Sequence, residues 1–171
     1  LGDVYKRQIK HSLIKKIDMI LTAHHVDDLI ENFFIRLLRG SGLKGLISFS
    51  KIKSKVNFND KINILRPLID IPKKDLAYIS NNTFNFNVND PSNLDDKFLR
   101  VRVRKLISNL EEDGLTFNKF KLSMNNLSKS NNAIDYYVQK NINDNSNYLK
   151  LNNSIILNDD FINQPDEIVF R

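Results

Sequence analysis

A polar turn between an apolar run and an amphipathic stretch constrains the fold more than any other feature of the sequence. Met19-Ile-Leu-Thr22 is a short apolar run, typical of a strand that is buried on both faces of a sheet. The apolar residues after the turn recur at helical spacing: Ile30, Phe33, Phe34, Leu37 and Leu38. Gly40 follows where a glycine commonly ends a helix. The order strand, turn, helix predicts an α/β fold.

Polar side chains gather at this junction. His24 follows the predicted strand, and ligands of open α/β sheets bind beyond the carboxyl ends of the strands. Asp28, Glu31 and Asn32 are three and four residues apart, so they share one face at the start of the predicted helix. We therefore expect two carboxylates and an imidazole to converge on one crevice.

Two blocks of motifs resemble those of the tRNA(Ile)-lysidine synthases, a family of PP-loop ATP pyrophosphatases. The first block is Ala23-His-His-Val-Asp-Asp-Leu-Ile-Glu31 with Arg36-Leu-Leu-Arg-Gly-Ser-Gly-Leu43. The second is Arg66-Pro-Leu68, Asp90-Pro-Ser-Asn93 and Arg100-Val-Arg-Val-Arg104. Several PP-loop families share the His-His-x-x-Asp part, whereas the Arg-Gly-Ser-Gly continuation together with the second block is much more specific.

The resemblance implies an α/β fold with part of a doubly wound parallel sheet, of the PP-loop or adenine nucleotide alpha hydrolase-like kind, followed by a mainly helical segment. It covers roughly residues 9–171 and is strongest over 22–104. The PP-loop signature itself, Ser-Gly-Gly-x-Asp-Ser, is absent, and we expect it upstream of Ile9 in a longer protein. Three segments are predicted: an adapter-derived scar over 1–8, the C-terminal half of the catalytic domain over 9–110, and over 111–171 a helical extension toward a missing C-terminal tRNA-binding domain.

The family's reaction has two steps. ATP adenylates the C2 oxygen of the wobble cytidine in tRNA(Ile) with a CAU anticodon, and the ε-amine of free L-lysine then attacks C2 and displaces AMP, leaving lysidine. A pyrophosphate leaving group needs Mg²⁺ and cationic donors. An incoming ammonium group needs carboxylates and a base. The resemblance thus implies ATP and Mg²⁺ as cofactors and tRNA and lysine as partners, although we expect this fragment alone to be inactive.

The resemblance also assigns residues to these tasks. Asp28 and Glu31 would bind the substrate lysine, and His24 would line the ATP and reaction-centre side. Arginines, whose guanidinium fork matches phosphate oxygens, would approach phosphate or the anticodon stem: Arg36, Arg39, Arg100, Arg102 and Arg104. A metal site of His24, Asp28 and Glu31 is an alternative, but their spacing fits no structural zinc pattern, so no metal ligand is assigned.

Simpler interpretations stand beside these assignments. His25 is best explained as a helix-flanking residue, and Asp27 as a capping or helix-dipole residue. Arg36 and Arg39 are also favourable near a helix C-terminus for dipole reasons alone. The arginines over 100–104 would equally suit a solvated face, and Val101 stands where the family usually has Asn.

Composition limits the alternatives. The net charge of +6 and the pI near 9.4 suit a polyanionic partner such as RNA, or ordinary solubility. The chain has no cysteine, which argues against its nearest enzyme rival, a 2-thiolating PP-loop enzyme, because such enzymes use cysteine for sulfur or cluster chemistry. A non-catalytic RNA-binding relic is the other alternative. No apolar run approaches the ~20 residues of a membrane helix, and we expect a cytoplasmic protein.

Periodicity predicts the remaining elements. Strands are expected over 62–65 and 155–157. Helices are expected at 9–17, from Asp70-Ile-Pro72 to about Ser80, and over 96–110 and 117–139, with another beginning at Asp159. Polar connections are expected over 51–61, 81–93 and 141–153.

Overall fold

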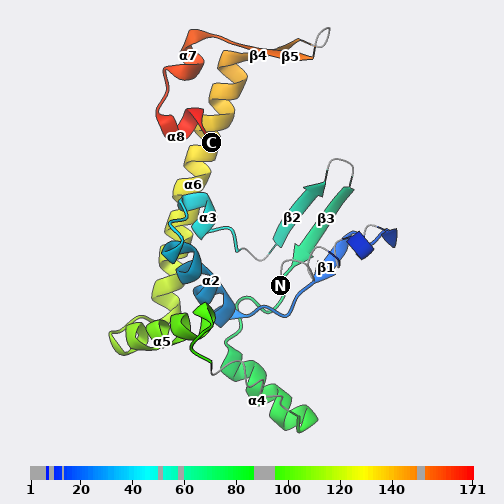
Figure 1. Ribbon diagram of the computed structural model, residues 1–171, viewed down its shortest axis with the longest axis vertical. Coiled ribbons are helices and arrows are strands. Elements are labelled where there is room, and N and C mark those ends of the chain that lie inside the picture. Colours follow the sequence, from blue (N-terminus) through cyan, green and yellow to red (C-terminus); the bar gives the residue numbers. More distant parts are fainter. Residues whose placement is uncertain are drawn as a thin grey trace. The chain divides into compact units, whose positions relative to one another are not determined.

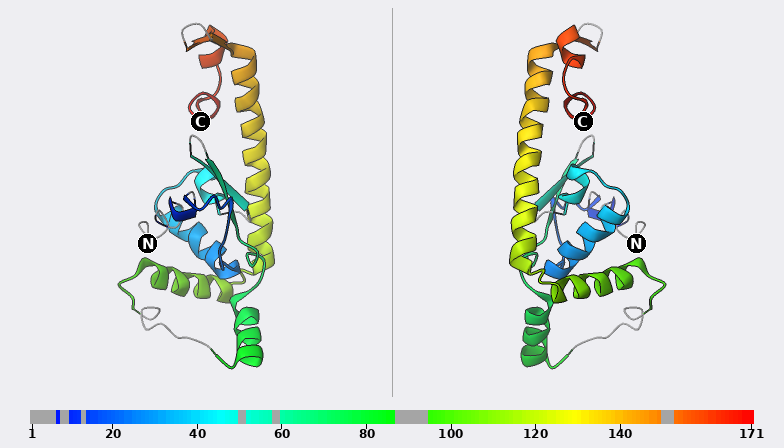
Figure 2. Two further views of the ribbon diagram at one scale, coloured as in Figure 1. Left: turned by 90° about the vertical axis from the view of Figure 1, so that its right-hand side faces the viewer. Right: turned by 90° about the vertical axis from the view of Figure 1, so that its left-hand side faces the viewer.

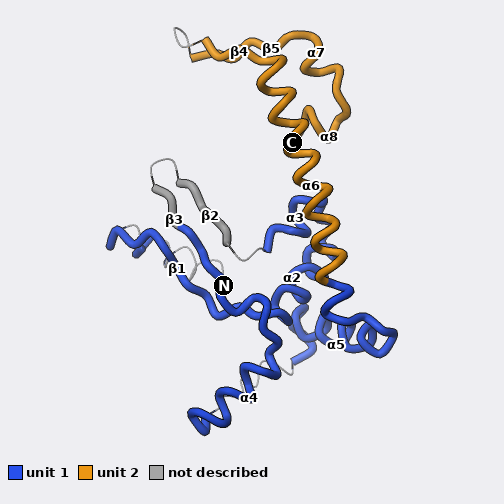
Figure 3. The backbone as a smooth tube through the Cα atoms, turned by 180° about the vertical axis from the view of Figure 1, so that it is seen from behind, with its two compact units in different colours: residues 1–120 blue, residues 121–171 orange. Residues whose placement is uncertain are grey.

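The computed structural model describes residues 7, 10–12, 14–49, 52–57, 60–86, 95–149 and 153–171 (Figure 1). By contacts, the chain divides into two compact units, residues 1–120 and residues 121–171 (Figure 3). The predicted turn over 90–93 lies outside the described residues.

A three-stranded sheet lies in the first unit, in the order β1-β3-β2. β1 (Met19–Leu21) runs parallel to β3 (Asp60–Leu65), with Ile20 opposite Ile64. β2 (Ile52–Asn57) runs antiparallel to β3. The prediction of a plain connection over 51–61 was therefore wrong: lysines interrupt the apolar alternation of this segment, but a backbone hydrogen-bond ladder does not depend on that alternation.

The burial expected for the first strand was also wrong. Met19 and Leu21 are 49% and 63% exposed, whereas Ile64 of β3 is fully buried. The reason is position: in the described sheet β1 is an edge strand that pairs with β3 alone. An apolar run is a good sign of a strand, but it does not say which neighbours cover it.

Helix α2 (Val26–Leu38) follows β1 and carries the predicted apolar stripe, with Val26 and Ile30 buried. Its first amide is fixed from outside the helix, because the Val26 N–H donates to the Ile71 carbonyl at 3.1 Å. Gly40 has φ +69°, a left-handed conformation that favours glycine, which confirms it as the residue that ends the helix. A short helix, α3 (Leu43–Leu46), comes next.

Two further helices complete the surroundings of α2 (Figure 2). α4 (Lys73–Phe84) begins after Pro72 and runs four residues beyond the predicted end, until Asn85 turns left-handed. α5 (Leu99–Glu112) packs against α2 through the buried Val101 and Val103. Phe120, buried at the end of the unit, meets the ring of Phe33 edge-on, with 5.2 Å between centroids.

The second unit begins within the long helix α6 (Phe117–Asn145). The helix continues into the segment predicted as a polar connector over 141–153, which was wrong there. Asn141 is buried and donates from its amide to the Phe161 carbonyl, so an asparagine-rich stretch is held by tertiary hydrogen bonds. The remaining elements are β4 (Ser146–Leu149) antiparallel to β5 (Ser154–Leu157), α7 (Asp159–Ile162) and α8 (Asp166–Val169).

Candidate functional site

His24 lies between β1 and α2 and is partly buried. Its Nδ1 is 2.9 Å from the Thr22 hydroxyl, and its ring meets Phe49 edge-on at 5.0 Å. Burial lowers the pKa of His24 from the usual 6.5, although Asp28 opposes this shift. His24 is therefore neutral at pH 7. As the pH falls below about 6.5, the unfolded chain binds this proton more readily, so the contribution of His24 to stability decreases.

Charges of both signs act on His24: Asp28 raises its pKa, whereas Arg66 and Arg100 lower it. Arg66 is only 6% exposed, and its guanidinium carbon lies 4.4 Å from the centroid of the Phe49 ring. Arg66 and Arg100 both contribute to lowering the pKa of His24, which shows that their charges reach the imidazole. Guanidinium groups, an aromatic ring and a neutral imidazole can together contact an anionic ligand.

Asp28 is fixed by the start of α2. Its Oδ2 accepts the His25 N–H at 3.0 Å and lies 3.4 Å from the His25 ring nitrogen Nε2. His25 is therefore the N-cap residue just before α2, in agreement with its interpretation as a helix-flanking residue. The Asp28 side chain remains 16% exposed, so it keeps access to a ligand.

Glu31 is a buried carboxylate, with its side chain 4% exposed, and two arginines of α5 compensate its charge. Arg104 Nε donates to Oε1 at 2.5 Å, and Arg100 Nε lies 3.5 Å from Oε2. The hydrogen bond to Glu31 raises the pKa of Arg104. These contacts join α2 to α5. They also place two of the predicted phosphate-binding arginines, Arg100 and Arg104, against the predicted lysine-binding Glu31.

The other three predicted arginines lie apart from this pair. Arg36 donates to the Asn32 side chain at 2.7 Å and to the Gly45 carbonyl at 3.2 Å, which ties α2 to α3. Arg39 is the exposed C-cap residue of α2. Arg102 is exposed and donates to the carbonyls of Asp96 and Lys97, just before α5.

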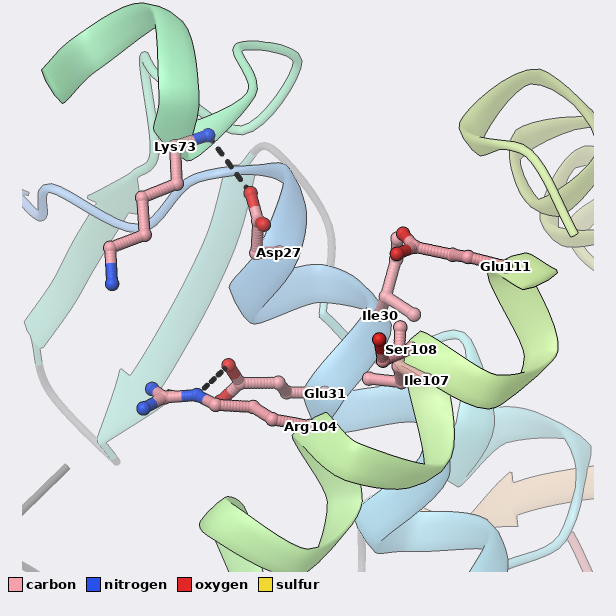
Figure 4. Close-up of a pocket in the computed structure, with 8 residues that line it drawn as sticks. All are labelled: Asp27, Ile30, Glu31, Lys73, Arg104, Ile107, Ser108 and Glu111. Carbon is pink, nitrogen blue, oxygen red and sulfur yellow. Dashed lines mark hydrogen bonds and ion pairs between the residues drawn. The ribbon is translucent and has the colours of Figure 1, made fainter. Parts of the chain in front are cut away.

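A cavity of about 200 Å³ opens beside Glu31, between α2, α5 and the start of α4 (Figure 4). Glu31 and Arg104 line it together with residues that the sequence analysis assigned to no ligand: Asp27, Ile30, Lys73, Ile107, Ser108 and Glu111. Ser108 and Glu111 stand four and seven residues after Arg104, so helical spacing alone places them on the arginine's face of α5. Their spacing from Arg104 in the sequence is therefore the signal by which Ser108 and Glu111 could have been predicted.

Asp27 has a structural task at the cavity. Its Oδ2 accepts the backbone N–H of Lys73 at 2.9 Å, so a residue of α2 caps the N-terminus of α4 (Figure 4). The capping predicted for Asp27 is thus seen on a different helix from its own. Among the described residues, no group of three or more His, Asp or Glu is placed to hold a metal, and no helix is long and apolar enough to cross a membrane.

The chain is similar in sequence to three relatives, each named tRNA(Ile)-lysidine synthase. That of Orientia tsutsugamushi is 45% identical over 92 residues, which are 53% of this chain and 20% of the relative. That of Rickettsia bellii is 43% identical over 103 residues, 58% of this chain and 23% of the relative. That of Rickettsia prowazekii is 43% identical over 88 residues, 51% of this chain and 19% of the relative. The matched part of the chain spans about a fifth of these relatives.

The predicted resemblance is therefore confirmed. A family model described as a PP-loop domain matches residues 5–111, which is more than half of the chain and includes β1, α2 and nearly all of α5. The α/β architecture around His24, Asp28 and Glu31 agrees with this match. The chain belongs to the PP-loop family.

Proposed function

We propose that this chain carries the lysine-binding and reaction-centre part of a tRNA(Ile)-lysidine synthase, within residues 9–110. The observation that supports this most strongly is the arrangement at α2: Asp28 and the buried Glu31 lie one turn apart, and the charge of Asp28 acts on His24. The relatives are named tRNA(Ile)-lysidine synthase. The reaction proposed for this chain is the one that the resemblance implies: joining of L-lysine to C2 of the wobble cytidine in tRNA(Ile) with a CAU anticodon.

Asp28 and Glu31 are the proposed binding groups for the lysine ε-ammonium. Asp28 is the more exposed of the two carboxylates and is proposed to take the proton, because an ammonium nitrogen can attack only after deprotonation. The new bond joins the lysine nitrogen to C2, the bond from C2 to the adenylated oxygen breaks, and AMP leaves. Arg104 holds Glu31 in position during this step.

When bound, ATP supplies the adenylate that makes the C2 oxygen a leaving group. The surroundings of His24 suit the phosphates of ATP, because Arg66 and Arg100 bring positive charge to them. Mg²⁺ would be bound chiefly through the phosphates, since Mg²⁺ usually combines one or two carboxylates with substrate phosphates. Arg36, Arg39 and Arg102 are proposed contacts to tRNA. We also infer that β1 and β3 belong to a doubly wound sheet with β2 as an antiparallel edge.

A chimera tests the proposal. The part of the Orientia tsutsugamushi relative that corresponds to residues 9–111 of this chain, within the PP-loop match, is replaced by those residues. ATP-dependent incorporation of labelled lysine into a tRNA(Ile) transcript is then measured. We expect incorporation by the chimera. Asp28→Asn should reduce it at least a hundredfold, because a positioned base contributes about 10²–10⁴, while tRNA binding is retained.

Asp75→Asn is the matched control, since this carboxylate lies in the first turn of α4 and does not line the cavity. Full incorporation by the Asp28→Asn chimera would contradict the proposal. A chimera that binds tRNA(Ile), has the parent's circular dichroism spectrum and incorporates no lysine would favour the non-catalytic RNA-binding alternative instead.

A further inference from the structure

We propose that the cavity between α2 and α5 binds the amino-acid end of free L-lysine, with Glu111 as the residue that recognises its α-ammonium group. The inference rests on the proposed function for the identity of the ligand. At about 200 Å³ the cavity suits one small metabolite, because pockets for drug-sized ligands measure roughly 300–1,000 Å³.

The cavity has two ends along α5. Arg104 and Glu111 are seven residues apart on one face of the helix, a separation of about 10 Å at 1.5 Å per residue. Figure 4 shows Glu111 and Ser108 on one side of the cavity and the Glu31–Arg104 pair on the other. Glu31, held by Arg104, stands at one end and Glu111 at the other, so a ligand with an ammonium group at each end can contact both carboxylates.

The two ends differ in their electrostatics. Glu31 is compensated by two arginines. Glu111 forms no ion pair with another residue that the structure describes, so the exposed end of the cavity is anionic. The Ser108 hydroxyl beside it can donate a hydrogen bond to the α-carboxylate of an amino acid.

The apolar part of the cavity wall suits the side chain of lysine. Ile30 and Ile107 line the cavity and offer apolar contact to the methylene groups of a lysine side chain. The ε-ammonium would then reach Glu31, one turn of α2 away from Asp28. Glu111 and Ser108 are accordingly specificity residues for the amino acid, and the reacting nitrogen lies at the opposite end.

Isothermal titration of the full chain tests this with three probes: L-lysine, Nα-acetyl-L-lysine, which lacks the α-ammonium charge, and norleucine, which lacks the ε-ammonium. Glu111→Gln should weaken L-lysine and norleucine binding about tenfold and leave Nα-acetyl-L-lysine unchanged, because only the first two carry the charge that Glu111 recognises. Ser108→Ala should weaken L-lysine binding to a smaller degree. Glu112→Gln, the adjacent exposed carboxylate outside the cavity, is the matched control and should bind as the parent does.

Equal L-lysine affinity in Glu111→Gln and Glu112→Gln would overturn the inference, and so would a parent chain that binds no lysine at millimolar concentration. A loss for Nα-acetyl-L-lysine that equals the loss for L-lysine would place the ε-ammonium at Glu111 and overturn it too. The Glu111→Gln chimera separates the two proposals: unchanged lysine incorporation and lysine affinity would leave the proposed function standing and remove this one.

Discussion

Glu31 shows what tertiary contacts do to a single charge. Its place on the polar face of a predicted helix is compatible with full solvation, yet its side chain is 4% exposed in the folded chain. Burial of a lone carboxylate is costly, so the residue depends on Arg104 and Arg100 for compensation. The ion pair is therefore asymmetric, with a buried anion and two partly exposed cations.

Arg104→Ala should destabilise the chain more than Glu31→Gln does. Loss of the arginine leaves a buried carboxylate with one more distant partner, and removal of one partner of a buried pair costs about 3–5 kcal/mol. The 36% exposed guanidinium, in contrast, can hydrate when Glu31 is neutralised. Urea unfolding measures both free energies. Arg102→Ala is the control, since Arg102 is exposed and bonds only to carbonyls, and it should cost less than about 1 kcal/mol. Equal losses for Arg104→Ala and Arg102→Ala would show that the buried pair does not stabilise the fold.

At the scale of elements, α2 organises the first unit. Its buried residues pack against α5, Arg36 ties it to α3, and Asp27 caps α4. The contacts of Arg36 and Asp27 start from polar residues near the two ends of the helix. The polar residues of the motif therefore hold neighbouring elements in addition to any chemistry that they perform.

Asp27→Ala should loosen the first turn of α4. The substitution removes the acceptor of the Lys73 N–H, and loss of a helix N-cap costs about 1 kcal/mol. Hydrogen exchange of the amides from Lys73 to Leu76 should become several-fold faster, with little change in α5. Asp75→Ala removes a nearby carboxylate without removing this bond, so exchange at Lys73 that is as fast in Asp75→Ala as in Asp27→Ala would refute the capping role.

At the scale of the whole molecule, the chain consists of two units with different internal contacts. The first has the mixed sheet and the helices around α2. In the second, Arg171 is 6% exposed at its side chain and contacts Asp135 at 3.2 Å, Glu167 at 3.3 Å and the side chain of Asn131. A single buried arginine thus joins α6 to the end of α8.

Arg171→Ala should destabilise the second unit alone. Asp135 and Glu167 are 47% and 67% exposed and can hydrate, so we expect a loss of about 1–2 kcal/mol from packing and hydrogen bonds. Hydrogen exchange should accelerate over residues 159–169 and stay unchanged in α2. Equal acceleration in both regions would show that the two units unfold together.

Local sequence patterns were enough to predict several elements of this molecule and its family. Helical spacing predicts α2 and its end at Gly40, and the apolar run predicts β1, because both signals lie within a few neighbouring residues. The motif from Ala23 to Glu31 likewise predicts membership of the PP-loop family, because motif residues and their spacing are local properties.

The tertiary structure alone decided which partners these residues have. The strand β2 exists through its pairing with β3, and β1 is exposed because it is an edge strand. The compensation of Glu31 by Arg104, 73 residues away, leaves no local pattern that fixes it. Hydrogen-bond ladders, burial and ion pairs between distant segments depend on packing, and periodicity records only which face of an element is apolar.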